Sequence, residues 1–590
     1  MSVDDTPRGV RPDAEDATPP QPVAPTELPG EPEHTTAAER RYPVDRVVFG
    51  VAGALVIAFI LWGVLSTATL SAVASAVLAG VITGGGWAFV LSASGFVVFA
   101  LWLAFSRYGR IPLGRDDEGP EFRTTSWIAM MFSAGMGIGL MFYGVAEPLS
   151  HFSSPPPGTV PADSEEALDV AMATTLFHWT LHPWAIYAVV GLSIAYSTFR
   201  CGRRQLISSA FAPLLGESRT DGPLGKFIDI LAIFATLFGS AASLGLGALQ
   251  IGAGLQANGM PPAGKGLLVA IIAILTVAFV CSAVTGVAKG IQFLSNVNMV
   301  LAAILAVFVF VAGPTILILN LLPTAIGDYF GNLAQMAART AASGGDATAE
   351  WLSGWTVFYW AWWISWTPFV GMFIARISRG RTIKQFVVGV ILIPSFVSLL
   401  WFAIFGGAAI NLQRSGTDLA SQDSESQLFG LLHSFPLGGA LSVLAMVLVA
   451  IFFVSGADAA SVVMGTLSQR GSIAPMRWVV IFWGVVMGAI AIIMLLVAPG
   501  DEALTGIQNI TIIMAAPFAL VMLLLCVALT RDLRHDPLVR RDNRSAQAVE
   551  QAVDYGTKTY GDQFFFPVKP HRPPTEETRA DDRTGSDRTP

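Results

Sequence analysis

Apolar residues occur along this chain in long runs that are separated by shorter polar segments. A helix needs about 20 predominantly apolar residues to cross the hydrocarbon core of a bilayer. The runs predict twelve membrane-spanning helices, near Val47–Thr67, Trp87–Phe105, Thr125–Val145, Ala167–Ser197, Ile228–Gln256, Leu267–Gly286, Ile291–Leu322, Trp351–Ile377, Phe386–Ile410, Leu441–Leu467, Trp478–Val497 and Ile507–Leu529. The predicted fold class is therefore an all-α polytopic membrane protein.

Positive charges are concentrated in every second loop between these runs. Arg40, Arg41 and Arg46 precede the first predicted helix, and basic clusters follow the second, fourth, eighth, tenth and twelfth. The loop from Glu147 to Asp169 carries several acids and neither Lys nor Arg. Because basic loops stay in the cytoplasm, both termini are predicted to be cytoplasmic and the number of helices to be even.

The two ends of the chain and one loop differ from the apolar runs. Residues 1–45 are polar and rich in Pro and Glu, which predicts a disordered cytoplasmic tail before a twelve-helix domain at 46–530. Residues 531–590 predict a cytoplasmic tail with a helical start at Arg540–Val553 and a disordered end. In the long loop Pro323–Glu350, the stretch Ile326–Thr340 predicts an amphipathic helix on the outer surface.

Composition narrows the class further. Of 590 residues, 53% are hydrophobic and 13% are charged, which excludes an ordinary soluble protein. The net charge is -7 without a basic stripe, which argues against nucleic acid as a partner. The three cysteines, Cys201, Cys281 and Cys526, lie too far apart in the sequence to suggest a metal site or a disulfide framework.

Aromatic residues are unusually dense in the eighth run. The segment Trp355–Trp366 holds five tryptophans, a tyrosine and a phenylalanine. Indole faces bind organic cations that cannot donate hydrogen bonds, and on a helix Phe358, Trp362, Trp366 and Phe369 share one narrow sector. An aromatic belt at the bilayer interface is the alternative. The depth of the run in its apolar segment favours a ligand-facing role for at least two tryptophans.

Glycines recur at every second position in the third run, within Ala134–Gly139. Alternating glycines weaken a helix, and unpaired backbone groups at membrane depth are tolerated only where they line a cavity. Close packing of helices through small residues is the alternative, but it prefers four-residue spacing. The pattern favours an unwound segment whose amides bind an anionic group. Together with the indoles, this segment suits a zwitterion with a quaternary ammonium and a carboxylate, as in compatible solutes.

Three motifs resemble those of the betaine/choline/carnitine transporter family. They are Gly135-Met-Gly-Ile-Gly-Leu-Met-Phe-Tyr-Gly-Val-Ala-Glu-Pro148, Phe177-His-Trp-Thr-Leu-His-Pro-Trp-Ala-Ile-Tyr187 and Trp362-Trp-Ile-Ser-Trp-Thr-Pro-Phe-Val-Gly-Met-Phe-Ile-Ala-Arg-Ile-Ser-Arg-Gly-Arg381. The resemblance covers roughly Arg46 to Arg534 and is greatest to the sodium-coupled glycine betaine carriers. It implies a homotrimer in the plasma membrane, in which helices 3–7 and 8–12 form two inverted five-helix repeats of the LeuT type.

The resemblance also implies roles for individual residues. Aromatic side chains around the ammonium group would be those of Trp179, Trp184, Tyr187, Trp362, Trp363 and Trp366. Gly135, Met136 and Gly137 would face the solute through their backbone, and Phe358 and Phe369 would gate or line its path.

The coupling ion implied by the resemblance is sodium, and no other cofactor is expected. Hard cations require oxygen ligands. One site would use Thr236, Ser240 and Phe369, and a second would use Ser133, Met136, Phe452 and Ser455. Hydroxyls at i and i+4 such as Thr236 and Ser240 are also common in ordinary helix packing. Gly456 stands where similar carriers have a second hydroxyl, which puts the second site in question.

The expected function is sodium-coupled import of glycine betaine, ectoine or a similar solute in osmotic stress, not enzymatic catalysis. Proton-coupled choline transport is disfavoured because Gly139 stands where that branch has Asp. Sodium-independent carnitine exchange is disfavoured because no Lys or Arg interrupts the run Ile228–Gln256. The C-terminal tail mixes acids with its bases, so osmotic activation through anionic membrane lipids is expected to be weaker or to work differently.

Overall fold

The computed structural model describes residues 42–135, 137–285, 288–497, 503–561 and 565. Across these residues the regular structure is helical, and the only extended pairing is an isolated bridge between Pro112 and Thr382. The predicted disordered tail at 1–45 and the predicted disordered end of 531–590 fall almost entirely outside this described part. The all-α prediction is confirmed.

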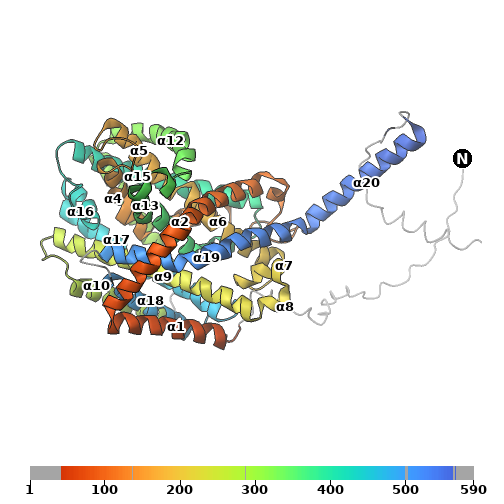
Figure 1. Cartoon of the computed structure of the whole chain (residues 1–590), viewed down its shortest axis with the longest axis horizontal. Coiled ribbons are helices and arrows are strands. Elements are labelled where there is room, and N and C mark those ends of the chain that lie inside the picture. Colours follow the sequence, from red (N-terminus) through yellow and green to blue (C-terminus); the bar gives the residue numbers. More distant parts are fainter. Residues whose placement is uncertain (1–41, 136, 286–287, 498–502, 562–564, 566–590) are drawn as a thin grey trace, which may run out of the picture.

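Each predicted span contains a helix, and four of the spans (the third, fourth, seventh and eighth) extend over two helices each. These helices are α1 (Arg46–Leu65), α2 (Thr67–Phe105), α3 (Thr124–Gly135) with α4 (Ile138–Ser153), α5 (Glu165–Trp179) with α6 (Leu181–Ala195), α9 (Pro223–Ala257), α10 (Lys265–Thr285), α11 (Ala288–Ala312), α14 (Thr356–Ile377), α15 (Ile383–Arg414), α17 (Gly438–Ser468), α18 (Arg477–Leu496) and α19 (Ala503–Arg534). Shorter or peripheral helices are α7 (Ala212–Leu215), α8 (Glu217–Thr220), α12 (Thr315–Ala337), α13 (Gly345–Gly354), α16 (Ser424–His433) and α20 (Pro537–Tyr560). The last of these extends away from the bundle (Figure 1).

Nine helices in the described part are long and apolar enough to cross a membrane. The divided third and fourth spans are not among them because each of their halves is short. The tryptophan-rich α14 is also missing, since its indole and phenol rings carry polar groups that lower its hydropathy. The third, fourth and eighth spans, which carry the unusual motifs, are thus absent from the nine. α11 is absent too, because its described apolar stretch Asn296–Ala312 is short, whereas α12 is among the nine.

Four predicted boundaries are wrong. The second helix begins at Thr67, not near Trp87, because small residues around three consecutive glycines continue the helix. The seventh run divides at Pro314, which has no amide hydrogen to continue the helix. α12 therefore begins at Thr315, and Pro323, which was predicted to begin a loop, lies inside it. The eighth run divides at Trp355, which leaves the helical conformation with φ -123° and ψ -88°.

The fourth error concerns Glu147, which the sequence pattern placed at the start of an acidic loop. α4 continues to Ser153, and the carboxyl group of Glu147 is completely buried inside it. The helix continues because neighbouring side chains satisfy this carboxyl group, as described below.

The packing of helices supports two five-helix repeats. A pseudo-two-fold axis that relates helices 3–7 to helices 8–12 pairs the third helix with the eighth, the fourth with the ninth, and so on. Each contact between two helices should therefore recur between the two helices that the axis relates to them. The eighth helix (α14) packs on the fourth (α6), and in the exchanged pair α4 of the third packs on the ninth (α15). Helices that would exchange with each other also pack together, α9 with α17 and α10 with α18. Because each repeat holds an odd number of spans, the second repeat crosses the membrane in the opposite direction.

Candidate functional site

The aromatic rings of α14 form a column along one side of the helix. The ring of Phe358 stacks on that of Trp362, with centroids 5.5 Å apart and planes inclined by 18°. Trp366 follows with its centroid 6.0 Å from that of Trp362, and Phe369 lies 5.8 Å from Trp366. The predicted common sector is confirmed. Phe358 and Phe369, the predicted gates, therefore lie at the two ends of the column.

The fourth span brings its aromatic residues to the same place because it is broken. Trp179 ends α5, and Thr180 has non-helical angles of φ -117° and ψ -105°. Pro183 in the first turn of α6 has no amide hydrogen for the carbonyl group of Trp179, which accounts for the break. Trp179 meets Trp363 edge to face at 4.9 Å between centroids, and Tyr187 lies 6.3 Å from Trp363.

The third span is interrupted between Gly135 and Ile138, where the glycine pattern predicted an unwound segment. Gly135 is the last residue of α3, and Met136 lies outside the described residues. Gly137 has an extended backbone and caps α4. A Cβ atom on Gly139 would lie 2.8 Å from Cη2 of Trp179 and 2.9 Å from Cη2 of Trp362. The absence of a side chain at Gly139 is therefore what lets the two indoles approach α4.

The interrupted third and fourth spans, the tryptophan-rich α14 and α15 together enclose one cavity. Its lining residues are Gly137, Gly139, Leu140, Trp179, Pro183, Trp184, Tyr187, Trp362, Trp363, Trp366 and Ser398. Seven of the nine predicted solute-binding residues are among them, and the other two are Gly135 and Met136. No Asp, Glu, Lys or Arg of the described part lines this cavity. The cavity therefore offers π surfaces and a backbone break without an ionised side chain.

The indole N–H groups of three lining tryptophans donate hydrogen bonds to residues that do not line the cavity. Trp363 Nε1 donates to the carbonyl oxygen of His178 at 3.0 Å, and Trp366 Nε1 donates to that of Gly239 at 2.9 Å. Trp362 Nε1 donates to Ser243 Oγ at 3.3 Å. These bonds fix the rings and leave their apolar surfaces for a ligand.

Two tryptophans of the run, Trp355 and Trp360, do not line the cavity. The ring of Trp360 stacks on His182 with centroids 5.0 Å apart and is completely buried. The ring of Trp355 packs on His151 at 4.5 Å. Both therefore contribute to packing around the site.

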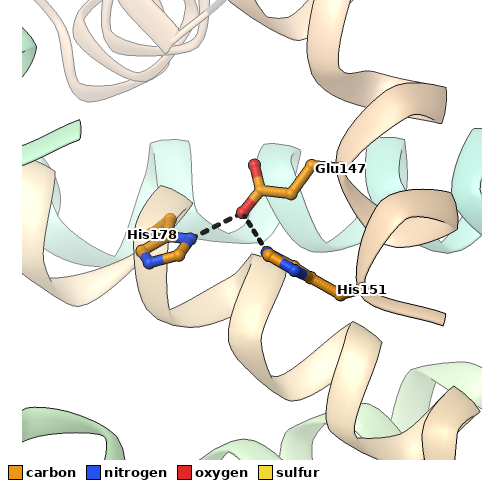
Figure 2. A group of neighbouring side chains, drawn as sticks. All are labelled: Glu147, His151 and His178. Atoms are coloured by element: carbon orange, nitrogen blue, oxygen red, sulfur yellow. Dashed lines mark hydrogen bonds and ion pairs between the residues drawn. The ribbon is translucent and has the colours of Figure 1, made fainter. Parts of the chain in front are cut away.

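A buried carboxyl group that the sequence interpretation overlooked lies behind the cavity. Glu147 Oε2 accepts hydrogen bonds from Trp179 Nε1 at 2.6 Å and from the Tyr359 hydroxyl at 2.5 Å. Glu147 Oε1 lies 2.6 Å from His178 Nδ1 and 3.5 Å from His151 Nε2. Figure 2 shows the carboxyl group of Glu147 between the two imidazole rings. The available signal was an ionisable residue within an apolar motif, which usually marks a functional position in a membrane protein.

Glu147, His151 and His178 are of residue types that bind metal ions, and their ligand atoms lie within 4.8 Å of one another. Two ligand atoms on one zinc ion, with bonds of about 2.0–2.1 Å in tetrahedral geometry, are roughly 3.3 Å apart. The 2.6 Å separation of Oε1 from His178 Nδ1 is a direct hydrogen bond and leaves no space for an ion between these atoms. His178 also pairs with Thr356 at 3.0 Å, so the arrangement is a hydrogen-bond network.

The first predicted sodium site lies where α9 packs on α14. Thr236 and Ser240 are both buried, and Gly239 between them accepts the hydrogen bond from Trp366, three residues before Phe369. The Thr236 hydroxyl donates to the carbonyl group of Ala232 at 2.9 Å, which leaves its oxygen lone pairs available.

The residues predicted for the second sodium site come from α3, from the break after it and from α17. A Cβ atom on Gly247 of α9 would touch both Ile138 of α4 and Val449 of α17, so α4, α9 and α17 meet at this point. Ser455 Oγ donates to the carbonyl oxygens of Ile451 at 2.8 Å and Phe452 at 3.3 Å. Ser133 belongs to α3, while Met136 lies outside the described residues.

A bundle of long apolar helices defines a polytopic membrane protein, and the aromatic cavity at its two helix breaks is a candidate solute site of the kind expected in a membrane transporter. The chain belongs to the betaine/carnitine/choline family transporters, whose sequence profile matches residues 47–538. This membership confirms the resemblance seen in the motifs, and with it the expectation of a transporter rather than an enzyme.

Several relatives match over most of their length. The chain is 47% identical to the betaine/ectoine transporter LcoP of Corynebacterium glutamicum, over 90% of this chain and 85% of the relative. It is 46% identical to the glycine betaine transporter OpuD of Bacillus subtilis, over 85% of this chain and 97% of the relative. An ectoine/hydroxyectoine transporter of Virgibacillus pantothenticus is 42% identical over 76% of this chain and 88% of the relative.

Proposed function

We propose that this protein imports a zwitterionic compatible solute, such as glycine betaine or ectoine, by sodium symport across the plasma membrane in response to osmotic stress. The observation that carries the proposal is the cavity, which joins aromatic surfaces to a backbone break and has no ionised side chain among its described lining residues. The relatives described as betaine and ectoine transporters support the same solute class.

In the proposed complex the cationic group lies among the rings of Trp179, Trp184, Tyr187, Trp362, Trp363 and Trp366. Cation–π attraction is strongest when the cation is desolvated, and these rings are largely buried. The carboxylate of the solute faces the backbone at Gly135–Gly137, where the interrupted helix provides amide groups. Phe358 and Phe369 close the path on either side.

Sodium completes the proposed cycle. Thr236, Ser240 and the backbone of Phe369 hold one ion where α9 meets α14. Ser133, Met136, Phe452 and Ser455 hold a second ion next to the break in the third span. Because both sites adjoin the helices that form the cavity, bound ions would stabilise the arrangement that binds the solute.

Competition in proteoliposomes tests the solute class. Uptake of radiolabelled glycine betaine is measured with ectoine, proline, carnitine or choline as competitor, each with and without sodium. We expect ectoine to compete well, choline to compete poorly, and uptake to require sodium. The proposal would be refuted if choline were the strongest competitor. It would also be refuted if exchange against carnitine without sodium gave as much glycine betaine uptake as a sodium gradient does.

A pair of variants ties the result to the cavity. Trp366→Leu removes a lining ring and should raise KM for glycine betaine at least tenfold, since a desolvated cation–π contact contributes about 2 kcal/mol. Trp87→Leu is the control, because this side chain of α2 is 59% exposed and lies outside the cavity. If the two substitutions changed KM equally, the cavity would not be the site that binds the solute.

A further inference from the structure

We propose that Glu147 is a positioning residue that sets the orientation of Trp179 and Tyr359, and thereby the affinity of the aromatic cavity for its solute. This inference rests on the proposed function, because it concerns the same cavity. Glu147 itself does not line the cavity and acts through the rings that it holds.

The carboxyl group of Glu147 connects three helices that build the cavity. It projects from α4, downstream of the glycine break, and is completely buried. Its Oε2 atom accepts from Trp179, the last residue of α5 before the second break, and from Tyr359 of α14. Its Oε1 atom pairs with His178, the neighbour of Trp179. A single side chain thus links both interrupted spans to the tryptophan-rich helix.

The held rings lie directly against the lining rings. Tyr359 stacks on Trp363, with centroids 5.8 Å apart and planes inclined by 18°. Trp179 stands edge to face on Trp363 at 4.9 Å. On its other side Trp179 meets the bare backbone of Gly139, so its indole has little freedom once its N–H group is bonded.

A carboxylate suits this position because it accepts several hydrogen bonds at once. Trp Nε1–H and a phenol hydroxyl are donors, and hydrogen bonds to an ionised acceptor are shorter and stronger than neutral ones. The Tyr359 hydroxyl and Trp179 Nε1 both donate to Oε2, so one carboxyl oxygen serves two donors from different helices. An apolar side chain at this position would leave both donors buried without their acceptor.

Four substitutions test this role in proteoliposomes, with uptake normalised to the amount of reconstituted protein. Glu147→Met removes both acceptor oxygens and should raise KM for glycine betaine at least tenfold, with a smaller effect on the maximal rate. Glu147→Gln keeps one acceptor oxygen and should stay within about threefold of the wild-type KM. Glu166→Met is the control, because Glu166 is an exposed residue in the first turn of α5. Trp179→Phe removes the donor and should also raise KM.

A double-mutant cycle separates positioning from general destabilisation. If Glu147 acts partly through Trp179, the combination of Glu147→Met with Trp179→Phe should raise KM by clearly less than the product of the two single effects. Fully additive losses, or an unchanged KM in Glu147→Met, would overturn the proposal. If Glu147→Met does not assemble, Trp179→Phe and Tyr359→Phe, which each remove one donor to Glu147 Oε2, should each raise KM. An unchanged KM in both variants would then overturn the proposal.

Quenching of intrinsic tryptophan fluorescence by glycine betaine provides a second measurement that does not require transport. A wild-type protein that shows neither quenching nor uptake would contradict the proposed function itself. A wild-type protein that binds glycine betaine, together with a Glu147→Met variant that binds it equally well, would contradict only the role of Glu147.

Discussion

Gly139 illustrates how a single residue can set the shape of the site. Any side chain there would meet the indoles of Trp179 and Trp362, because the Cβ atom alone comes within 2.9 Å of each ring. Real Cβ atoms do not tolerate such distances, so one or both rings would have to move. An aspartate at this position would demand a differently arranged cavity, which gives the sequence argument against choline a steric basis.

Gly139→Ala should therefore raise KM for glycine betaine at least tenfold, because the added methyl group displaces rings that line the cavity. Concentration-dependent uptake in proteoliposomes measures the effect. Gly95→Ala is the control, since a Cβ atom on Gly95 of α2 has no neighbour within 4 Å. An unchanged KM in Gly139→Ala would show that the rings are not packed against α4 as described.

Gly456 is the opposite case, because a Cβ atom there has no neighbour within 4 Å. A serine would fit without strain and would restore the second hydroxyl of the proposed second sodium site. Gly456→Ser should lower the KM for sodium by about two- to tenfold, as an added oxygen ligand favours a hard cation. Gly456→Ala, which adds the carbon without the hydroxyl, should not. Equal sodium dependence of the two variants would argue against an ion at this position.

At the scale of elements, the decisive features are the interruptions in otherwise continuous helices. The fourth span breaks at Thr180, and Pro183 supplies the cause because the carbonyl group of Trp179 has no amide partner there. The break turns Trp179 toward Glu147 and places Trp184 and Tyr187 on a separate helix. The shape of the cavity thus depends on the backbone hydrogen bond that Pro183 cannot donate to the carbonyl group of Trp179.

Pro183→Ala should restore an amide donor and favour a continuous fourth helix, since proline inside a helix costs about 3 kcal/mol. We expect a KM for glycine betaine raised at least fivefold, without loss of thermal stability in detergent. Uptake kinetics and a melting curve on the same preparation test this. A destabilised variant with a normal KM would mean that the break serves packing rather than the cavity.

Sequence patterns predicted some of these elements well and others poorly. Hydropathy located α9, α15, α17 and α18 to within a few residues at each end, because their apolar runs end at polar loops. The glycine alternation correctly marked the break after Gly135. The breaks at Thr180 and Trp355 were missed because both lie in apolar segments, where a hydropathy average does not change.

The site residues were predictable to the extent that their chemistry is local. Aromatic rings at helical spacing pointed to the column on α14, and the motifs pointed to α6. Glu147 and Ser398 were missed because their roles arise from contacts across helices. The ionisable residue in an apolar motif was a signal for Glu147, but the donors that satisfy its carboxyl group come from two other helices and cannot be read from its own segment.

At the scale of the whole molecule, the C-terminal helix is anchored to the helix that carries part of the cavity. Asp536 caps α20 and is 1% exposed. It accepts from the Tyr196 hydroxyl at 2.8 Å and from Arg200 Nε at 2.9 Å, at the end of the fourth span. Arg203 pairs with Asp532 at 2.6 Å beside it. α20 beyond these contacts mixes acidic and basic residues.

Truncation after Arg541 keeps these anchoring pairs, and the lost segment lacks a purely basic surface for anionic lipid. We therefore expect uptake and its dependence on osmolality to change by less than about twofold. Asp536→Ala removes the anchor itself and should change the maximal rate more than the truncation does. A sharp loss of osmotic activation after truncation would show that the distal tail is the sensor.

The most direct test of the account is the accumulation of glycine betaine against its own gradient in proteoliposomes. An inward sodium gradient is applied at a fixed membrane potential, and the final inside-to-outside ratio is measured as the gradient is varied. A potential of about 100 mV supplies roughly 2.3 kcal/mol for each sodium ion that enters, so accumulation should rise steeply with both the gradient and the potential. Accumulation that never exceeds equilibrium, or that depends only on solute preloaded inside, would contradict sodium-coupled import.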